Sequence, residues 1–203
     1  MTPEERRAYV RDHRTAILGY SRKSHGPAMS AVYFALDEAS DTILVSTMRD
    51  RLKARVVARN PKVSLCILDE NYPLNYLQVY CDAEIDHDPD HAIDTMLAIA
   101  KSMAHDPLGT ERPTLAAGVD AEGEQAVQMK SMLDSALSGG VNDGAMRAFL
   151  GARAAEENRV TIRLHPYETF ETPPSHTSLD TQFDTTTERF FGTSLPWRDP
   201  SEG

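Results

Sequence analysis

Residues 43–68 read ILVSTMRDRLKARVVARNPKVSLCIL. The pattern predicts a strand, a basic turn, a short amphipathic helix that ends before Pro61, and a second strand. The first strand ends in Ser46 and Thr47, and four cations follow: Arg49, Arg51, Lys53 and Arg55. Hydroxyl groups, amides at a helix start and flexible positive charge suit an anion, so the junction is expected to hold a cofactor phosphate. The alternative is a basic helix face that is merely solvated.

The charge of the chain is unevenly distributed. The formal net charge of −10 argues against nucleic acid or an anionic membrane as the main partner. Residues 49–62 nevertheless contain six cations and one acid, whereas residues 82–94 contain six acids and neither Lys nor Arg. A basic island on an acidic protein favours a local anion site.

Composition indicates a cytoplasmic protein with one sizeable core. At 203 residues there is room for one core and one long extension or insertion. The longest apolar runs are strand-sized and the N-terminal segment has no apolar core, which predicts no membrane span and no secretory signal. Cys66 and Cys81 lie in apolar strand patterns, which favours buried reduced thiols over a disulfide or a metal site.

Outward from residues 43–68, the pattern predicts an α+β chain with a mainly β core. Strands are expected at 15–22, 27–36, 42–47, 63–68, 76–85 and 159–165. Helices are expected at about 3–12 (capped by Thr2), 50–60 (capped by Asp50), 90–105, 124–137 and 145–155. Short turns between the early strands favour an antiparallel sheet closed into one small barrel.

The second expected strand alternates, so that Ser30 and Val32 share one face while Met29 and Tyr33 share the other. The expected cofactor-binding domain spans residues 1–171, with a helical insertion at about 90–158. Residues 172–203 form a C-terminal extension rich in Thr, Ser and Pro, expected to be extended or wrapped on a partner subunit.

Several catalytic signatures are missing from the sequence. It contains no GxSxG elbow, HExxH pair, Walker loop or GxGxxG turn, and its seven histidines have no motif partners. With no evident nucleophile or acid–base pair, the catalytic residues stay unknown and the chemistry is expected to reside in a bound cofactor.

Residues 27–68 resemble the flavin and deazaflavin split-barrel family, whose best-known member type is pyridoxamine 5'-phosphate oxidase. The shared pattern is G-P-x-M-S-x-V-Y-F, a short turn, I-L-V-S-T, a basic cluster and N-P-K-V-S-L-x-I-L-D, then L-Q-V at the start of the fifth strand. The resemblance covers residues 15–86 well and 159–166 weakly. It implies a six-stranded antiparallel split β-barrel with peripheral helices, and a homodimer with the cofactor at its interface.

The resemblance also implies roles for individual residues. Arg51 and Lys53 form an Arg-x-Lys pair similar to that of the subgroup that binds coenzyme F-420, in which the pair grips the cofactor phosphate. Arg49 and Arg55 would then reach an anionic tail of the cofactor, and Trp197 weakly matches a C-terminal aromatic of the family. The expected cofactor-binding residues are Met29, Ser30, Val32, Tyr33, Ser46, Thr47, Arg49, Arg51, Lys53 and Gln78. Since both faces of a strand cannot line one site, only some of the first four are expected there, and Gln78 is expected to reach the cofactor from the neighbouring subunit.

Three functions stay open at this point. The first is an oxidoreductase that moves a hydride between coenzyme F-420 and a small organic substrate. The alternatives are an oxidase or reductase of the same fold that uses FMN, and a non-catalytic carrier of a flavin, haem or tetrapyrrole-type ligand. Pyridoxamine-phosphate oxidase activity is least favoured because it needs a second phosphate site. No second basic cluster is evident, although Arg159 and Arg163 flank the last expected strand.

Overall fold

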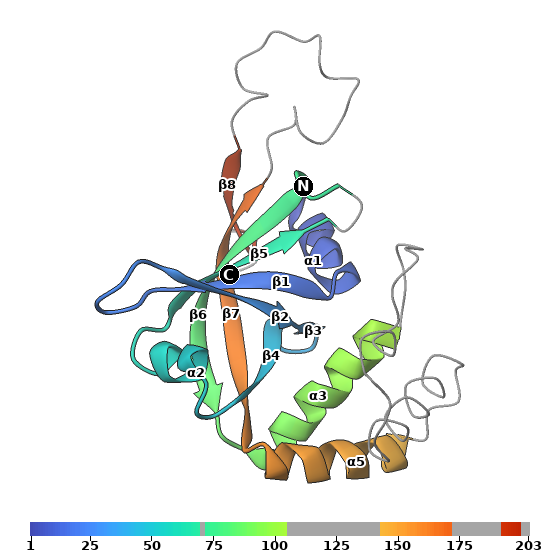
Figure 1. The fold of residues 1–203 in the computed structure, drawn as a ribbon. Helices are drawn as coiled ribbons and strands as arrows, with labels where there is room; N and C mark the ends of the chain where they lie inside the picture. Colours follow the sequence, from blue (N-terminus) through green and yellow to red (C-terminus); the bar gives the residue numbers. More distant parts are fainter. Residues whose placement is uncertain (70–71, 105–142, 172–191, 200–203) are drawn as a thin grey trace, which may run out of the picture.

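A computed structural model describes residues 1–69, 72–104, 143–171 and 192–199 of the chain (Figure 1). One curled antiparallel sheet forms the centre, with helices around it. The elements are α1 (Pro3–Asp12), β1 (Thr15–Tyr20), β2 (Ala28–Tyr33), β3 (Ala35–Asp37), β4 (Thr42–Met48), α2 (Leu52–Val57), β5 (Lys62–Leu68), β6 (Tyr76–Asp86), α3 (Pro89–Ala104), α5 (Asp143–Glu156), β7 (Arg159–Glu171) and β8 (Thr193–Pro196).

The sheet curls because β2 and β3, which follow one another in the chain, form the two ends of its strand order. That order is β2-β1-β5-β6-β7-β4-β3, with β8 paired to β7 outside this path. Only Phe34 separates β2 from β3, and there the chain changes partner from β1 to β4. The α+β class and the antiparallel pairing are confirmed, but the predicted count of six strands is wrong: the second expected strand divides at Phe34, and β8 is added to β7.

Alternation along the strands sends one set of side chains into the core, as predicted. In β6 the buried positions are Leu77, Val79, Cys81 and Ala83, and β5 alternates in the same way. The last expected strand is longer than predicted, because β7 continues through Pro166 to Glu171. The β6–β7 register shifts between Tyr80 and Cys81, next to Pro166, and a bulge is where a strand tolerates proline.

Of the two predicted helix caps, one is confirmed and one is wrong. Thr2 caps α1 as expected: its Oγ1 accepts from the Glu5 amide at 3.2 Å and the Glu5 carboxylate accepts from the Thr2 amide. The predicted Asp50 cap of α2 is wrong, because the cap position is Arg51 and no side chain bonds there. Helix α2 has six residues and is shorter than the predicted helix at 50–60. Strand β5 begins directly after Pro61.

Helices α3 and α5 cover one side of the sheet. Helix α3 packs against β7, β4 and β3, and α5 packs against α3 and β7. A buried hydroxyl pair joins α3 to the sheet, since Thr161 donates to Thr95 at 2.8 Å. Within the described ranges, no helix combines the length and apolar character that crossing a membrane requires. The helix expected at 124–137 lies outside the described residues.

The described segment 193–197 packs on the chain's own sheet. Trp197 follows β8 and is 1% exposed, and its indole Nε1 donates to Asp41 at 2.9 Å. The guanidinium of Arg7 lies 5.5 Å from the centre of the indole ring. Trp197 therefore belongs to the core, and its weak match to a cofactor-contacting aromatic is wrong within this chain.

Candidate cofactor-binding site

A cavity of about 290 Å³ lies between the outer face of the sheet and the helices α2, α3 and α5. Two kinds of side chain meet in it: apolar groups, mostly from α3, and polar or cationic groups from the sheet and α2. Its lining residues are Ala31, Val32, Tyr33, Ser46, Lys53, Met96, Ile99, Ala100, Met103, Leu150 and Arg159. A mostly apolar cavity with a few convergent polar groups is typical of a small-molecule site.

Lys53 is the cation of α2 that lines this cavity. Burial lowers the pKa of Lys53 most, and the positive charges of Arg51 and Arg159 lower it further. Within the described ranges, Lys53 has no carboxylate partner to offset these effects. Three positive charges therefore lie close together, and a bound anion would reduce the repulsion between them.

Arg159 reaches the same cavity from the start of β7. Its Nη1 donates to Ser46 Oγ at 3.2 Å and its Nε donates to a Glu157 carboxylate oxygen at 2.6 Å. The chain turns from α5 into β7 at Asn158, whose φ of 48° is in the left-handed region. The Asn158 carbonyl accepts from the Arg49 amide at 2.9 Å, which ties the basic turn to the start of β7.

Of the four expected residues on β2, two line the cavity. They are Val32 and Tyr33. Ser30 shares a face of β2 with Val32 but lies outside the cavity, and its hydroxyl is 3.1 Å from the Tyr20 hydroxyl. Met29 shares the outer face with Tyr33 and is 75% exposed, outside the cavity.

The expected residues of β4 and the basic turn are also divided. Ser46 lines the cavity, whereas Thr47 is only 3% exposed, on the core side of β4, because neighbouring strand residues face opposite ways. Arg49 and Arg51 are exposed beside the cavity, and Arg51 is close enough to influence the pKa of Lys53. The structure therefore brings Ser46 and Lys53 together with Arg51 nearby.

Gln78 lies far from this group within one chain. It pairs with Phe170 near the end of β7, whereas Arg159 begins that strand. Arg159 itself was not among the expected site residues. Its sequence signal was a cation at the start of the last strand, and the pairing of that strand with β4, which places it beside Ser46, is not visible in the sequence.

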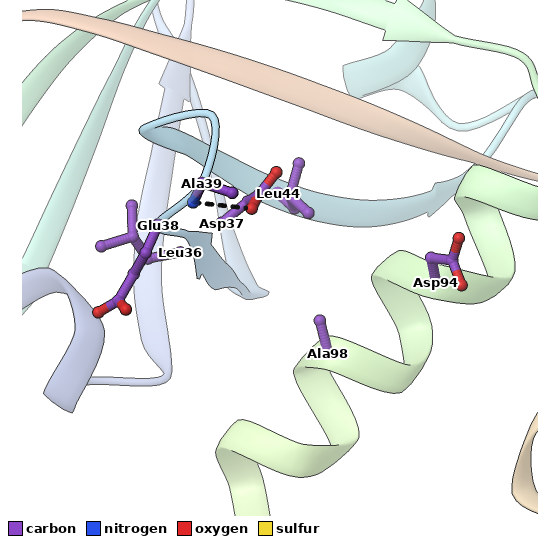
Figure 2. Close-up of a pocket in the computed structure, with 7 residues that line it drawn as sticks. All are labelled: Leu36, Asp37, Glu38, Ala39, Leu44, Asp94 and Ala98. Atoms are coloured by element: carbon purple, nitrogen blue, oxygen red, sulfur yellow. Dashed lines mark hydrogen bonds between the residues drawn. The ribbon is translucent and has the colours of Figure 1, made fainter. Parts of the chain in front are cut away.

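A second cavity, of about 520 Å³, lies between α3 and the turn that joins β3 to β4 (Figure 2). It is larger, but its carboxylates already have partners. Asp37 accepts from the Ala39 amide and the Ser40 hydroxyl, Asp94 pairs with Arg147, and Glu38 lies 3.4 Å from Arg11. We therefore place the candidate site in the smaller cavity, where Lys53 has no carboxylate partner within the described ranges.

Neither cysteine lies in the candidate site. Both are free thiols; Cys81 is buried in β6 and Cys66 is half-buried in β5. Burial raises the pKa of each thiol, which keeps both protonated at neutral pH. Across the part of the chain that the structure describes, no group of three or more His, Cys, Asp or Glu residues is arranged to hold a metal ion.

Comparisons with solved structures found several proteins of similar fold and low sequence identity, of which the first below has a TM-score above 0.5. Among solved structures, a conserved hypothetical protein from Mycobacterium tuberculosis matches with a TM-score of 0.51 and 18% identity, over 83% of this chain and 82% of that one. An F420 reductase matches with a TM-score of 0.46 and 19% identity, over 80% and 93% of the two chains. A putative pyridoxamine 5'-phosphate oxidase from Listeria innocua matches with a TM-score of 0.47 and 15% identity, over 83% and 96%.

No curated protein matches the chain. The family model described as pyridoxamine 5'-phosphate oxidase matches residues 2–127, which is more than half of the chain. That range includes the curled sheet from β1 to β6 and the basic turn with Lys53. The chain therefore belongs to the pyridoxamine 5'-phosphate oxidase family of split-barrel proteins.

Proposed function

We propose that the chain is an oxidoreductase that binds a phosphate-bearing cofactor of the flavin type in the 290 Å³ cavity. The observation that carries this proposal is the position of Lys53, which is partly buried beside Arg51 and Arg159 with no carboxylate partner in the described ranges. Placing like charges together away from water is unfavourable. A phosphate relieves both the repulsion and the loss of hydration through charge-assisted hydrogen bonds.

The remaining walls suit a planar ring. Met96, Ile99 and Met103 form an apolar side on α3, and Tyr33 faces the same cavity from β2. Thioether and aromatic side chains adapt to flat aromatic ligands and exclude water from them. When bound, a flavin or deazaflavin supplies the hydride transfer, a reaction that needs a cofactor. The chain's own residues hold the phosphate, orient the ring and keep its surroundings dry.

Coenzyme F-420 is the cofactor that we propose first, with FMN as the alternative. The support is the Arg51-Leu52-Lys53 spacing, which is similar to that of the deazaflavin-binding subgroup. Arg49 and Arg55 are exposed on either side of Lys53 in the sequence, and an anionic tail of the cofactor would meet their positive charge. The proposed reaction is hydride transfer between F-420 and a small organic substrate.

We further propose a homodimer with the cofactor at its interface. The outer face of the sheet carries a row of aligned residues that runs from Ala31 of β2 across Ile17 and Cys66 to Gln78 of β6. Ala31 also lines the cavity, so this face joins the cavity to Gln78 across four strands. A second copy docked on this face would bring its own Gln78 toward the cavity, which would explain a site residue that is remote within one chain.

The test is a titration of the purified protein with F-420 and with FMN, followed by fluorescence. We expect F-420 to bind in the low micromolar range or tighter and FMN to bind more weakly. Tighter binding of FMN would favour the alternative cofactor, and binding of neither would refute the proposed function. Tight binding without turnover of a broad panel of unsaturated and carbonyl substrates would instead indicate a carrier.

A further inference from the structure

We infer that Arg159 is a third phosphate-binding cation of this site, held in position by Glu157 and Ser46 before the ligand arrives. The inference rests on the proposed function and extends it with a residue from β7, outside the Arg51 and Lys53 pair. Arg159 lines the cavity together with Lys53, and its positive charge contributes to lowering the pKa of Lys53.

The backbone around Arg159 brings two basic segments together. Helix α5 runs directly into β7 at this point (Figure 1). The left-handed conformation of Asn158 makes this abrupt change of direction possible, and its carbonyl holds the Arg49 amide. Arg159 is therefore placed by the backbone contact that also fixes the start of the basic turn.

The hydrogen bonds of Arg159 orient its guanidinium without using all of its donors. Nε and Nη2 contact the same Glu157 oxygen, at 2.6 and 2.5 Å, and Nη1 donates to Ser46. A guanidinium has five N–H donors, so these three contacts leave two, one on Nη1 and one on Nη2. The side chain keeps 22% exposure, which leaves room for a ligand oxygen.

Glu157 serves here as a positioning residue. Its carboxylate also binds Arg153, at 2.7 Å, so it is held from both sides. A planar guanidinium fixed in advance loses little freedom when it accepts a phosphate. Because the carboxylate offsets part of the charge of Arg159, the net charge that remains at the cavity is carried mainly by Lys53 and Arg51.

The experiment compares a ligand that carries the phosphate with one that lacks it, and FMN and riboflavin differ by the phosphate alone. Binding of FMN and of riboflavin is measured for the wild type and for Arg159→Gln, which keeps N–H donors but has no charge. If the wild type binds only deazaflavins, F-420 is compared with its deazaflavin riboside, which lacks both the phosphate and the anionic tail. We expect Arg159→Gln to lower the preference for the phosphorylated ligand about tenfold while leaving riboflavin affinity unchanged. The matched control is Arg163→Gln, on the same strand, whose guanidinium faces Glu84 and Asp86 and lies outside the cavity.

Three outcomes are separable. If the wild type binds neither phosphorylated cofactor, the proposed function fails, and the inference fails with it. If the wild type binds one of them and Arg159→Gln keeps the same preference for phosphate, only the inference is overturned. If Arg159→Gln does not fold, modification of wild-type arginines by phenylglyoxal, mapped by mass spectrometry, decides. Protection of Arg159 by FMN beyond that given by riboflavin supports the inference, and equal protection by the two ligands contradicts it.

Discussion

Lys53 of α2 and Arg159 of β7 line one cavity, although 106 positions separate them in the sequence (159 − 53). Burial and two neighbouring guanidinium groups, Arg51 and Arg159, lower the pKa of Lys53. The sheet creates this proximity by pairing β7 with β4, next to the basic turn. Binding sites often contain like charges that destabilise the ligand-free protein and that a bound ligand neutralises.

Lys53→Met should stabilise the ligand-free protein. The substitution keeps the aliphatic stem and removes a charge that is partly buried and repelled by its neighbours. We expect the free energy of unfolding in urea at pH 7 to rise by roughly 0.5–1 kcal/mol, because solvent screens part of the repulsion at this half-exposed group. Arg59→Met, at an exposed position beyond the end of α2, should change it by less than about 0.5 kcal/mol. A loss of stability in Lys53→Met would show that the ammonium group has a favourable partner.

The contribution of Asp41 to the stability of the protein should be lost as the pH becomes acidic. Burial by itself raises the pKa of Asp41, but hydrogen bonds from Arg7, Trp197 and Arg198 outweigh it and lower the pKa below its usual value. A carboxylate with a lowered pKa contributes stability above the unfolded-state pKa and loses it as the pH falls through the folded-state pKa. Asp41→Asn should therefore cost about 2 kcal/mol at pH 7 and progressively less below about pH 4.

Urea unfolding of wild type and Asp41→Asn across pH 3 to 7 checks this. Asp50→Asn, in the exposed turn after β4, is the matched control and should show no such difference. A stability difference for Asp41→Asn that stays constant over this range would mean that the carboxylate charge does not hold the C-terminal segment.

Gly192→Ala should weaken the attachment of β8. A Cβ at this position would lie 2.2 Å from the Phe170 ring and 2.5 Å from the Glu171 carbonyl oxygen, which belongs to the backbone. Overpacking of this kind costs about 1–3 kcal/mol, so the melting temperature should fall by several degrees. Gly26→Ala is the control because no atom lies within 4 Å of its Cβ position. Equal melting temperatures for the two variants would contradict the close approach of β7 at Gly192.

Met29→Glu should disrupt the proposed dimer. Met29 is 75% exposed on the outer face of β2, next to the row that leads from Ala31 to Gln78. A charge in the middle of an apolar interface is costly, so the wild type should sediment as a dimer and this variant as a monomer. Leu74→Glu, in the loop before β6, should leave the dimer intact. A monomeric wild type would refute the proposed assembly.

Local pattern was sufficient to predict most elements of the fold. The capping box at Thr2 and the alternation of β5 and β6 depend on neighbouring residues alone, so the sequence reports them directly. The break at Phe34 and the length of β7 depend on which strand pairs with which, a non-local property. Both Ser46 and Thr47 were expected at the cofactor, but neighbouring residues of β4 face opposite ways, and only Ser46 lines the cavity.

Only the site residues that come from one continuous segment of the sequence could be predicted. Lys53 was predicted from the basic cluster of residues 49–55, and the structure places it at the start of α2 with its side chain lining the cavity; its contact with a cofactor stays a prediction. Arg159 and the apolar residues of α3 reach the same cavity through tertiary packing, and their sequence signals are those of an ordinary strand start and an amphipathic helix. Gln78 would complete the site only through a second chain, so its role stays a prediction.

The central claim is that Lys53 binds the phosphate of the cofactor in this cavity. The most direct test is a titration of wild type, Lys53→Met and Arg59→Met with F-420 and FMN under one set of conditions. Loss of one charge-assisted contact to the phosphate should weaken binding in Lys53→Met by about tenfold or more, with Arg59→Met equal to the wild type. Unchanged affinity of Lys53→Met for both cofactors would contradict the claim.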